Sequence, residues 1–469
     1  LTLSHLKADY ISNLSYLFNN MTNLIYIDLS EFESPKIEHS LDGLFYNCTH
    51  LEYIDLASYD FTNTINITNM FRGCTSLISL DLSSFTNSKI HDFSYLFNDC
   101  DKLSALFMSN FKGSSVTNRM DYMFSNCKSL KSLELNDLEL RHTTNISGMF
   151  DGCTSLKNIY LQNEEHSNIY DYSYMFNNCI SLTSINLARF EDSKVPNIMD
   201  YMFNNCINLK RVQFYVGFVG FDTSYTTSMK FMFNNCTSLA NYAMINIFIN
   251  GVSDLSYMFN NCTSLTNFEI NNKIYLPNPE IISIKFEYMF NNCTQLSTFD
   301  ISNLELTSKI SLKGMFYNCI NLEQIIFYEF ALPEVYDLSY MFYNCKSLTS
   351  IDLSIFSIIN QPNSLEAMFY GCSNLTFINI FALDTFQTTN MKLLFANCSS
   401  LTSLNLTNFI TSSVTDMNGM FANCKSLKDL NLESFDTKYV LDMSAMFQNC
   451  EMIIFLNLDN FNTSSVTRM

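Results

Sequence analysis

The sequence predicts an α/β repeat protein, a parallel solenoid in which each coil of 26–27 residues contains one short strand and one short helical turn. Three observations predict it: the regular spacing of the cysteines, a leucine pattern after each cysteine, and turn-forming residues before it. Neighbouring cysteines are 26 or 27 residues apart, except from Cys206 to Cys236 (30) and from Cys262 to Cys293 (31). A constant period of this length indicates stacked coils. With Met21 in the position of a first cysteine, residues 1–469 form a single continuous solenoid of about seventeen repeats.

The strand of each coil is predicted by the residues that follow the cysteine. A leucine stands three positions later, with Ile453 as the one exception, and apolar residues follow at three and five further positions, as in Leu401, Leu404 and Leu406. This alternation places every second side chain on one face of a short strand. Strands of successive coils would then stack in parallel along one side of the solenoid.

The helical turn is predicted by the residues at its two ends. Each repeat has a phenylalanine three residues before its cysteine, as Phe421 before Cys424. Five residues before this phenylalanine, most repeats carry Asp, Asn or Ser, as at Asn66 and Asp416. These side chains accept hydrogen bonds from free N–H groups at a helix start. The residue before each cysteine is Asn, Gly or Asp, as at Asn423, which suits the left-handed backbone of a helix end. The two wider cysteine gaps predict longer loops near residues 214–228 and 271–283.

The cysteines all occupy the same position of their coils. No Cys-x-x-Cys motif occurs, and neighbouring side chains in a stack would point in parallel rather than toward each other. We therefore expect a structural ladder of reduced, buried thiols rather than a disulfide framework or metal site. Its members are Cys48, Cys74, Cys100, Cys127, Cys153, Cys179, Cys206, Cys236, Cys262, Cys293, Cys319, Cys345, Cys372, Cys398, Cys424 and Cys450.

Composition and motifs argue against several classes of function. The net charge of −19 and the pI near 4.6 disfavour binding to nucleic acid, whose phosphates require a basic surface. No run of eighteen apolar residues occurs, so we expect no membrane span in this chain. The six histidines stand at different positions of the repeat, and no glycine-rich phosphate loop is present. We predict no catalytic residue, no cofactor and no metal, and hence no enzyme.

The outer face of the strands is the candidate binding face. The position between the last two inward-facing apolar residues should point outward, and it is acidic or aromatic in many coils. The candidate residues are Asp28, Asp55, Asp81, Phe107, Glu134, Tyr160, Glu269, Asp300 and Asp352. In the last coils this position holds asparagine, and a hydrogen-bonded amide ladder is expected there. The asparagines are Asn379, Asn405, Asn431 and Asn457.

Asn-x-Ser/Thr sequons are frequent and have two interpretations. They are N-glycosylation sites if a eukaryote secretes the chain, whereas the same asparagines also serve as turn residues followed by Ser or Thr. The candidates are Asn13, Asn20, Asn47, Asn66, Asn145, Asn235, Asn261, Asn292, Asn374, Asn397, Asn405 and Asn462.

The repeats resemble a known family. Residues 420–427 (Met-Phe-Ala-Asn-Cys-Lys-Ser-Leu) and 430–437 (Leu-Asn-Leu-Glu-Ser-Phe-Asp-Thr) closely resemble the BspA-like leucine-rich repeats, in the variant first described in mycoplasma surface lipoproteins. The resemblance covers essentially the whole chain and implies a leucine-rich-repeat-like solenoid. It also implies a protein at the cell surface that acts in adhesion, or in binding to matrix or host proteins, without common catalytic residues.

Two functions are expected from this interpretation. The first is a non-enzymatic, extracellular or cell-surface repeat protein that mediates adhesion or binds protein or glycan ligands at a cell surface or matrix. The alternative is a structural subunit that assembles end to end with itself into an extracellular filament, because neither end carries a polar cap. The same observation leads us to expect that the chain is part of a longer array.

Overall fold

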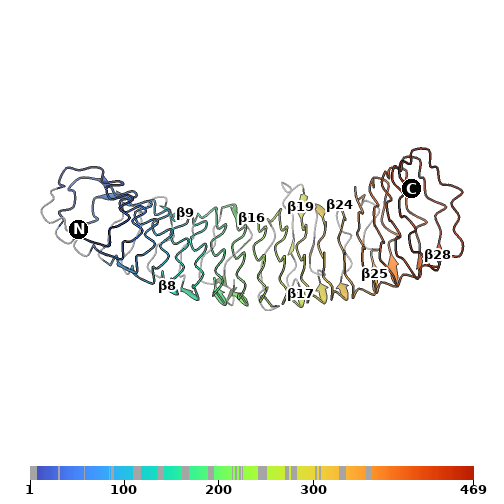
Figure 1. The fold of residues 1–469 in the computed structure, drawn as a ribbon, viewed down its shortest axis with the longest axis horizontal. Coiled ribbons are helices and arrows are strands. Elements are labelled where there is room, and N and C mark those ends of the chain that lie inside the picture. Colours follow the sequence, from blue (N-terminus) through green and yellow to red (C-terminus); the bar gives the residue numbers. More distant parts are fainter. Residues whose placement is uncertain are drawn as a thin grey trace. The chain divides into compact units, whose positions relative to one another are not determined.

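A computed structural model describes most of the chain, in two compact units, Leu1–Ser228 and Met229–Met469. The described residues are 8–29, 32–56, 59–83, 85, 89–108, 118–135, 142–160, 168–187, 195–213, 215–216, 219–220, 223, 225–240, 251–269, 274–275, 283–300, 304–305, 308–326, 334–354 and 361–469. Each unit is a parallel solenoid whose coils repeat about every 26 residues (Figure 1). Continuity of the solenoid from one unit to the next stays a prediction.

The strands predicted after the leucine pattern are confirmed in fifteen coils, and we call them the leucine row. In the last coil residues 453–458 form no strand, and residues 241–250, where the strand after Cys236 was expected, lie outside the described residues. Parallel pairing places equivalent residues beside each other: Tyr26 faces Tyr53, and Asp28 faces Asp55. In the first unit the row consists of β1 (Tyr26–Asp28), β3 (Tyr53–Asp55), β5 (Ser79–Asp81), β6 (Ala105–Phe107), β8 (Ser132–Glu134), β10 (Asn158–Tyr160), β11 (Ser184–Asn186) and β13 (Arg211–Gln213). In the second unit it consists of β17 (Asn267–Glu269), β20 (Thr298–Asp300), β23 (Gln324–Ile326), β25 (Ser350–Asp352), β26 (Phe377–Asn379), β27 (Ser403–Leu404) and β28 (Asp429–Leu430).

A second row of strands was not predicted. It lies along the opposite edge of each unit, and its strands contain or adjoin the position predicted to begin the helical turn (Figure 1). In the first unit it comprises β2 (His39–Ser40), β4 (Thr64–Asn66), β7 (Asn118–Arg119), β9 (Thr143–Asn145), β12 (Asn197–Ile198) and β16 (Thr226–Ser228). In the second unit it comprises β19 (Ser283–Lys285), β22 (Lys309–Ser311) and β24 (Val335–Asp337). Single bridges, such as Asp416 to Asp442, continue it.

Four short strands among the described residues lie outside the two rows. β14 (Tyr215–Val216) and β15 (Val219–Gly220) pair antiparallel within the first predicted long loop. β18 (Ile274–Tyr275) lies in the second predicted loop and pairs in parallel with β21 (Leu304–Glu305). Residues 214, 217–218, 221–222, 224, 271–273 and 276–282 of these predicted loops lie outside the described residues.

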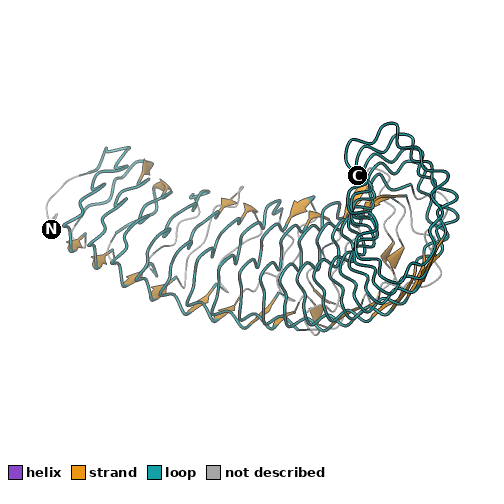
Figure 2. Cartoon of the chain, turned by 45° about the vertical axis from the view of Figure 1, so that its right-hand side comes forward, coloured by secondary structure: helices purple, strands orange, loops and turns teal. Residues whose placement is uncertain are grey.

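The predicted helical turn is wrong. Over the described ranges the chain forms strands, loops and turns, and no helix (Figure 2). The backbone N–H of Met420 donates to the carbonyl of Met417 at 3.2 Å, whereas the N–H of Phe421 donates to the carbonyl of Met446 in the next coil at 3.0 Å. An α-helix would direct both groups to carbonyls four residues back in the same segment. Bonds between coils therefore replace bonds within a helix.

Two left-handed residues in each of these segments explain why no helix forms. The one before the cysteine was predicted and is confirmed, as at Asn423 with φ of 62°. Another stands four residues earlier, as at Gly419 with φ of 57°, and this position is often tyrosine, as at Tyr257 with φ of 58°. A right-handed helix cannot contain either conformation. The segment becomes a series of tight turns.

The core of each coil is a set of columns that run from coil to coil. A phenylalanine stands three residues before each cysteine. It is buried, except for the half-buried Phe447, and its ring stacks on the equivalent rings of the neighbouring coils. Ring centroids are 5.5 Å apart from Phe97 to Phe124 and again from Phe124 to Phe150. Such columns contribute apolar burial and ring stacking at each step.

The cysteines form a parallel column beside the phenylalanines. All are free thiols, and all except the half-buried Cys450 are buried. The Cys127 Sγ lies 3.3 Å from the carbonyl oxygen of Phe97, to which it donates, and Cys319 makes the equivalent bond to Phe290 at 3.1 Å. A thiol thus fills apolar space and also satisfies a carbonyl of the preceding coil.

Candidate binding face

The outer side of the leucine row is built by strand alternation. In β3 the central Ile54 is buried, whereas Tyr53 is 50% exposed and Asp55 is half-buried. In β25 the buried Ile351 likewise lies between exposed Ser350 and Asp352. Because the strands pair in register, outward side chains at equivalent positions form lines across successive coils.

The predicted face residues all lie at the last position of a leucine-row strand. Asp81, Phe107, Tyr160 and Asp352 are exposed, and Asp28, Asp55 and Asp300 are half-buried, while the side chains of Glu134 and Glu269 lie outside the described part of the chain. The register places Asp28 beside Asp55, Asp81 beside Phe107, Glu134 beside Tyr160, Glu269 beside Asp300, and Asp352 beside Asn379. The residues therefore lie in line with their neighbours inside each unit.

A second line of outward-facing side chains, at the first position of the leucine-row strands, was not predicted from the sequence. Tyr26 and Tyr53, 41% and 50% exposed, stack there with ring centroids 5.7 Å apart and an interplanar angle of 11°. Desolvation and the carboxylates of Asp28 and Asp55 raise the pKa of Tyr26, so the phenol stays neutral at pH 7. This line could have been predicted from the sequence, because the alternation of a strand also turns outward the residue before the second apolar position of the leucine pattern.

Exposed apolar side chains lie next to these two tyrosines. Ile25, directly before β1, is 58% exposed, and Ile78, directly before β5, is 47% exposed. With Tyr26, Tyr53, Asp28, Asp55 and Asp81, these residues form what we call the tyrosine patch of the first unit. It combines a stacked aromatic pair with a row of carboxylates, a combination suited to a partner that is both apolar and basic.

The second unit carries a hollow of about 410 Å³ on its leucine row, across β23, β25 and β26. Glu323, Gln324, Ser350 and Asp352 line it on the polar side, and Phe377, 57% exposed, forms an apolar wall. Asp352 is held in place, because its Oδ1 accepts from the Ser354 N–H at 2.8 Å and from Asn379 Nδ2 at 2.9 Å. The hollow can accept a polar group beside an apolar one.

The amide ladder expected in the last coils lies at a different position. Asn405, Asn431 and Asn457 accept the N–H two residues further along, at 3.2, 2.9 and 3.0 Å. Such Asx turns use the amide oxygen of each side chain within its own coil. Asn379 makes the same turn with the Phe381 N–H at 3.3 Å, and its Nδ2 donates to Asp352 rather than to another asparagine. The ladder instead runs through the asparagines before the cysteines, as from Asn449 to Asn423 at 2.8 Å and from Asn423 to Asn397 at 2.9 Å.

The sequon asparagines differ in their surroundings. Asn13, Asn20, Asn374, Asn405 and Asn462 are exposed, Asn145 is buried, and Asn47, Asn66, Asn235, Asn261, Asn292 and Asn397 are half-buried. Asn261 donates to Asn235 at 2.6 Å and accepts from Asn292 at 2.7 Å, so a glycan on this nitrogen would break the ladder. The exposed sequons have room for a sugar, and glycosylation stays a prediction.

A metal or catalytic site requires side chains of suitable chemistry that lie close together. The described ranges contain no cluster of three His, Cys, Asp or Glu side chains that could hold a metal. His39 is buried and bonds to the Tyr59 hydroxyl at 2.9 Å, and burial lowers its pKa. Burial also raises the pKa of Cys206 and Cys372 to about 12, which leaves these thiols protonated and unreactive at neutral pH.

A helix long and apolar enough to cross a bilayer is not found in the part of the chain that the structure describes.

Comparisons with solved structures find solenoids from several organisms. A leucine-rich repeat protein from Bacteroides ovatus is 14% identical, with 100% of this chain and 91% of that chain covered and a TM-score of 0.44. A leucine rich cell surface protein from Faecalibacterium prausnitzii is 16% identical over 85% of each chain, with a TM-score of 0.30. The plant peptide hormone receptor RGFR1, solved in complex with RGF2, is 14% identical, with 100% and 92% coverage and a TM-score of 0.23. No curated protein matches the chain.

Family models match most of the chain. The model described as "Mycoplasma protein of unknown function, DUF285" matches residues 12–134, 69–184, 118–213, 269–375 and 363–469. The model described as "BspA type Leucine rich repeat region (6 copies)" matches residues 168–303, which confirms the resemblance inferred from the repeats. The BspA-type match is confined to residues 168–303, whereas the DUF285 matches span more than half of the chain, which therefore belongs to the DUF285 family.

Proposed function

We propose that the protein is a non-enzymatic, extracellular or cell-surface binding protein that uses the outer face of its leucine row to bind a protein partner. The observation that carries the proposal is the tyrosine patch, where the stacked Tyr26 and Tyr53 stand beside Asp28 and Asp55. The partner is an extended, basic protein segment. Attachment of the source cell to a surface or matrix would follow from such binding.

A low entropy cost and complementary charge favour binding of such a segment at the tyrosine patch. The two rings already stack on each other, so a partner orders few rotatable bonds when it packs on them. Aromatic side chains of this kind carry much of the energy of protein interfaces, and their faces also attract Lys and Arg. The carboxylates would steer a basic segment toward the patch and set its register.

Synthetic peptides test this proposal directly. The full chain is immobilised and titrated with a ten-residue peptide of alternating arginine and threonine, and with its alternating glutamate and threonine counterpart, at two salt concentrations. We expect only the arginine peptide to bind, with weaker binding at high salt. Tyr53→Ala should weaken binding at least about tenfold, or about 1.4 kcal/mol.

The matched control is Tyr170→Ala. Tyr170 is 48% exposed in the same unit, but it lies next to Asp171 of the second strand row and not on the leucine row. This variant should bind like the wild type. Equal binding of both peptides, or an equal loss in the two variants, would refute the proposal for the tyrosine patch.

The cellular location is part of the proposal and has its own test. Antibodies raised against the chain should label intact cells of the source organism. Labelling only after the cells are permeabilised would contradict a surface location.

A further inference from the structure

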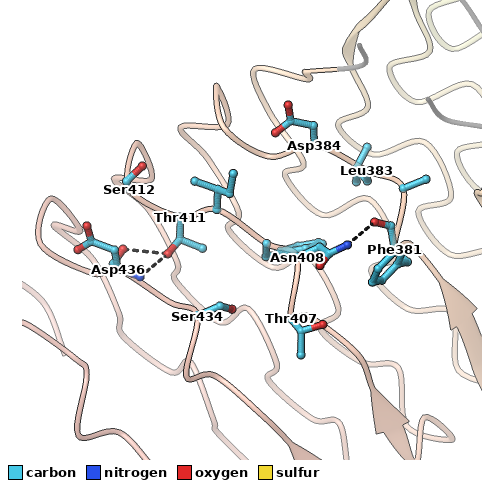
Figure 3. A pocket seen from close by; sticks show the side chains of 12 residues that line it. Phe381, Leu383, Asp384, Thr407, Asn408, Thr411, Ser412, Ser434 and Asp436 are labelled. Carbon is cyan, nitrogen blue, oxygen red and sulfur yellow. Dashed lines mark hydrogen bonds between the residues drawn. The ribbon is translucent and has the colours of Figure 1, made fainter. Parts of the chain in front are cut away.

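We propose that a hollow in the second unit, away from the leucine-row strands, binds an aromatic side chain of a protein segment whose next residue is basic. The hollow has a volume of about 670 Å³ and is formed by three successive coils, through residues 381–384, 407–412, 434 and 436 (Figure 3). These segments follow the leucine-row strands in their coils. We call this hollow the loop groove.

The walls of the loop groove are apolar and accessible. Phe381 is 58% exposed and Ile410 is 42% exposed, and they belong to neighbouring coils. Leu383 and Phe409 lie buried behind them, and the small Ala382 leaves space between the coils. A hollow of this size with an apolar lining is suited to one large apolar side chain.

The loops that form the groove are fixed to one another by buried threonines. The hydroxyl of Thr411 donates to the carbonyl of Asp436 at 2.9 Å and accepts from its N–H at 2.8 Å (Figure 3). Thr385 makes the same pair of bonds with Ile410, at 2.9 and 2.7 Å. The loops are thus held in position before a ligand arrives, which lowers the entropy cost of binding.

Polar groups along the groove also form hydrogen bonds within the protein. Asn408 Nδ2 donates to the carbonyl of Phe381 at 3.0 Å (Figure 3). Because this amide nitrogen and the Thr411 hydroxyl already have partners within the protein, a ligand gains little by hydrogen bonding to them. Selection in the groove should therefore come from apolar contact and charge.

The charge along the groove has one sign. Two of the twelve lining residues, Asp384 and Asp436, are acidic, and none is basic. Asp384 Oδ2 accepts from Gln361 Nε2 at 2.7 Å, and Asp436 Oδ1 accepts from the Lys438 N–H at 3.0 Å, so both carboxylates bond to neutral donors. Each keeps its negative charge available to a cation. A lysine or arginine beside the anchored aromatic side chain complements this charge.

Charge also separates this ligand from other candidates. A second copy of the chain brings a net charge of −19, and a fatty acid brings a carboxylate, so both meet repulsion at Asp384 and Asp436. An aromatic and basic protein segment meets none. The site is independent of the tyrosine patch, which lies in the other unit.

Fluorine NMR on the full chain tests the loop groove. The probe is an acetylated dipeptide amide of para-fluorophenylalanine and lysine, and the comparison probe has glutamate in place of lysine. We expect the lysine probe to bind and the glutamate probe to bind at least fivefold more weakly. Ile410→Asp should weaken the lysine probe at least fivefold, because a charge replaces part of the apolar wall.

Two further variants separate binding in the groove from a general effect. Leu441→Asp changes a side chain that is 50% exposed and lies outside the groove, and it should bind like the wild type. Asp436→Asn keeps an oxygen for the Lys438 N–H but removes the charge, so the preference for lysine over glutamate should fall at least threefold. Equal binding of the two probes, or an equal loss in Leu441→Asp and Ile410→Asp, would overturn the proposal.

Discussion

At the residue scale, the left-handed positions decide how neighbouring coils fit. Tyr122 has φ of 54°, and its ring covers Gly148 of the next coil, where an added Cβ would come within 2.2 Å of the ring. Where two such positions both hold tyrosine the rings stack instead, as for Tyr174 and Tyr201 with centroids 4.8 Å apart. A left-handed residue other than glycine costs about 1–2 kcal/mol, which ring stacking offsets in part.

Two substitutions at this position of the coil should differ in their effect on the free energy of unfolding. Gly148→Ala should lower the free energy of unfolding by more than about 1 kcal/mol, because the methyl group meets the Tyr122 ring and the left-handed backbone becomes unfavourable. Ala445→Gly, at an exposed alanine with φ of 60°, should leave stability unchanged or raise it by up to about 1 kcal/mol. Urea unfolding of both variants measures this. A stabilising Gly148→Ala would contradict our account of the turn.

At the element scale, each row or column joins one residue per coil to its equivalents in neighbouring coils. Thiols bond to carbonyls, phenylalanines stack, and asparagine amides bond to one another, all at the period of the repeat. A defect at one position therefore removes contacts with the coils on both sides. Stability is expected to be a sum of coil terms and nearest-neighbour terms.

The phenylalanine column offers a direct test. Phe233 and Phe259 are fully buried and stack with centroids 5.5 Å apart. Replacing either with alanine should cost about 3–5 kcal/mol, because a large cavity opens in the column. The exposed Phe377 is the control, and its replacement with alanine should change stability by no more than about 0.5 kcal/mol. An unchanged urea midpoint for Phe233→Ala would show that the inward face is assigned wrongly.

At the scale of the whole molecule, the buried thiols give the chain a common response to alkaline pH. Burial raises the pKa of Cys48 to about 11, and of Cys293 and Cys424 to about 12. In an unfolded chain a thiol has a pKa near 8.5. Because the folded pKa is the higher one, the stability that each neutral thiol contributes is complete below about pH 8.5 and is lost as the pH rises toward the folded pKa.

We therefore expect the unfolding midpoint in urea to be constant from pH 7 to about pH 8 and to fall steeply between about pH 9 and pH 12. Alkylation with iodoacetamide at pH 8 should modify Cys450, the half-buried thiol, before the others. Mass spectrometry of the modified peptides identifies the reacted sites. Rapid, uniform alkylation of the native chain, or stability that does not change up to pH 11, would contradict the buried thiol column.

The sequence by itself determined the features that repeat with the coil. The period, the leucine-row strands, the left-handed residue before each cysteine and the outward position of residues such as Asp352 follow from local patterns of apolar and turn-forming residues. The acidic half of the tyrosine patch could be predicted for the same reason. Its aromatic half lay at the other outward position and could have been found by applying the same alternation once more.

Only the tertiary structure decided where the backbone hydrogen bonds go. Asp416 accepts the N–H of Asn418 at 2.8 Å, as a helix cap would, yet the N–H of Phe421 donates to the next coil. A capping oxygen at the start and a left-handed residue at the end occur both in helices and in stacked turns. The sequence therefore could not distinguish a helix from stacked turns. The second strand row and the loop groove arise in the same way, because contacts between coils, rather than patterns within one coil, create them.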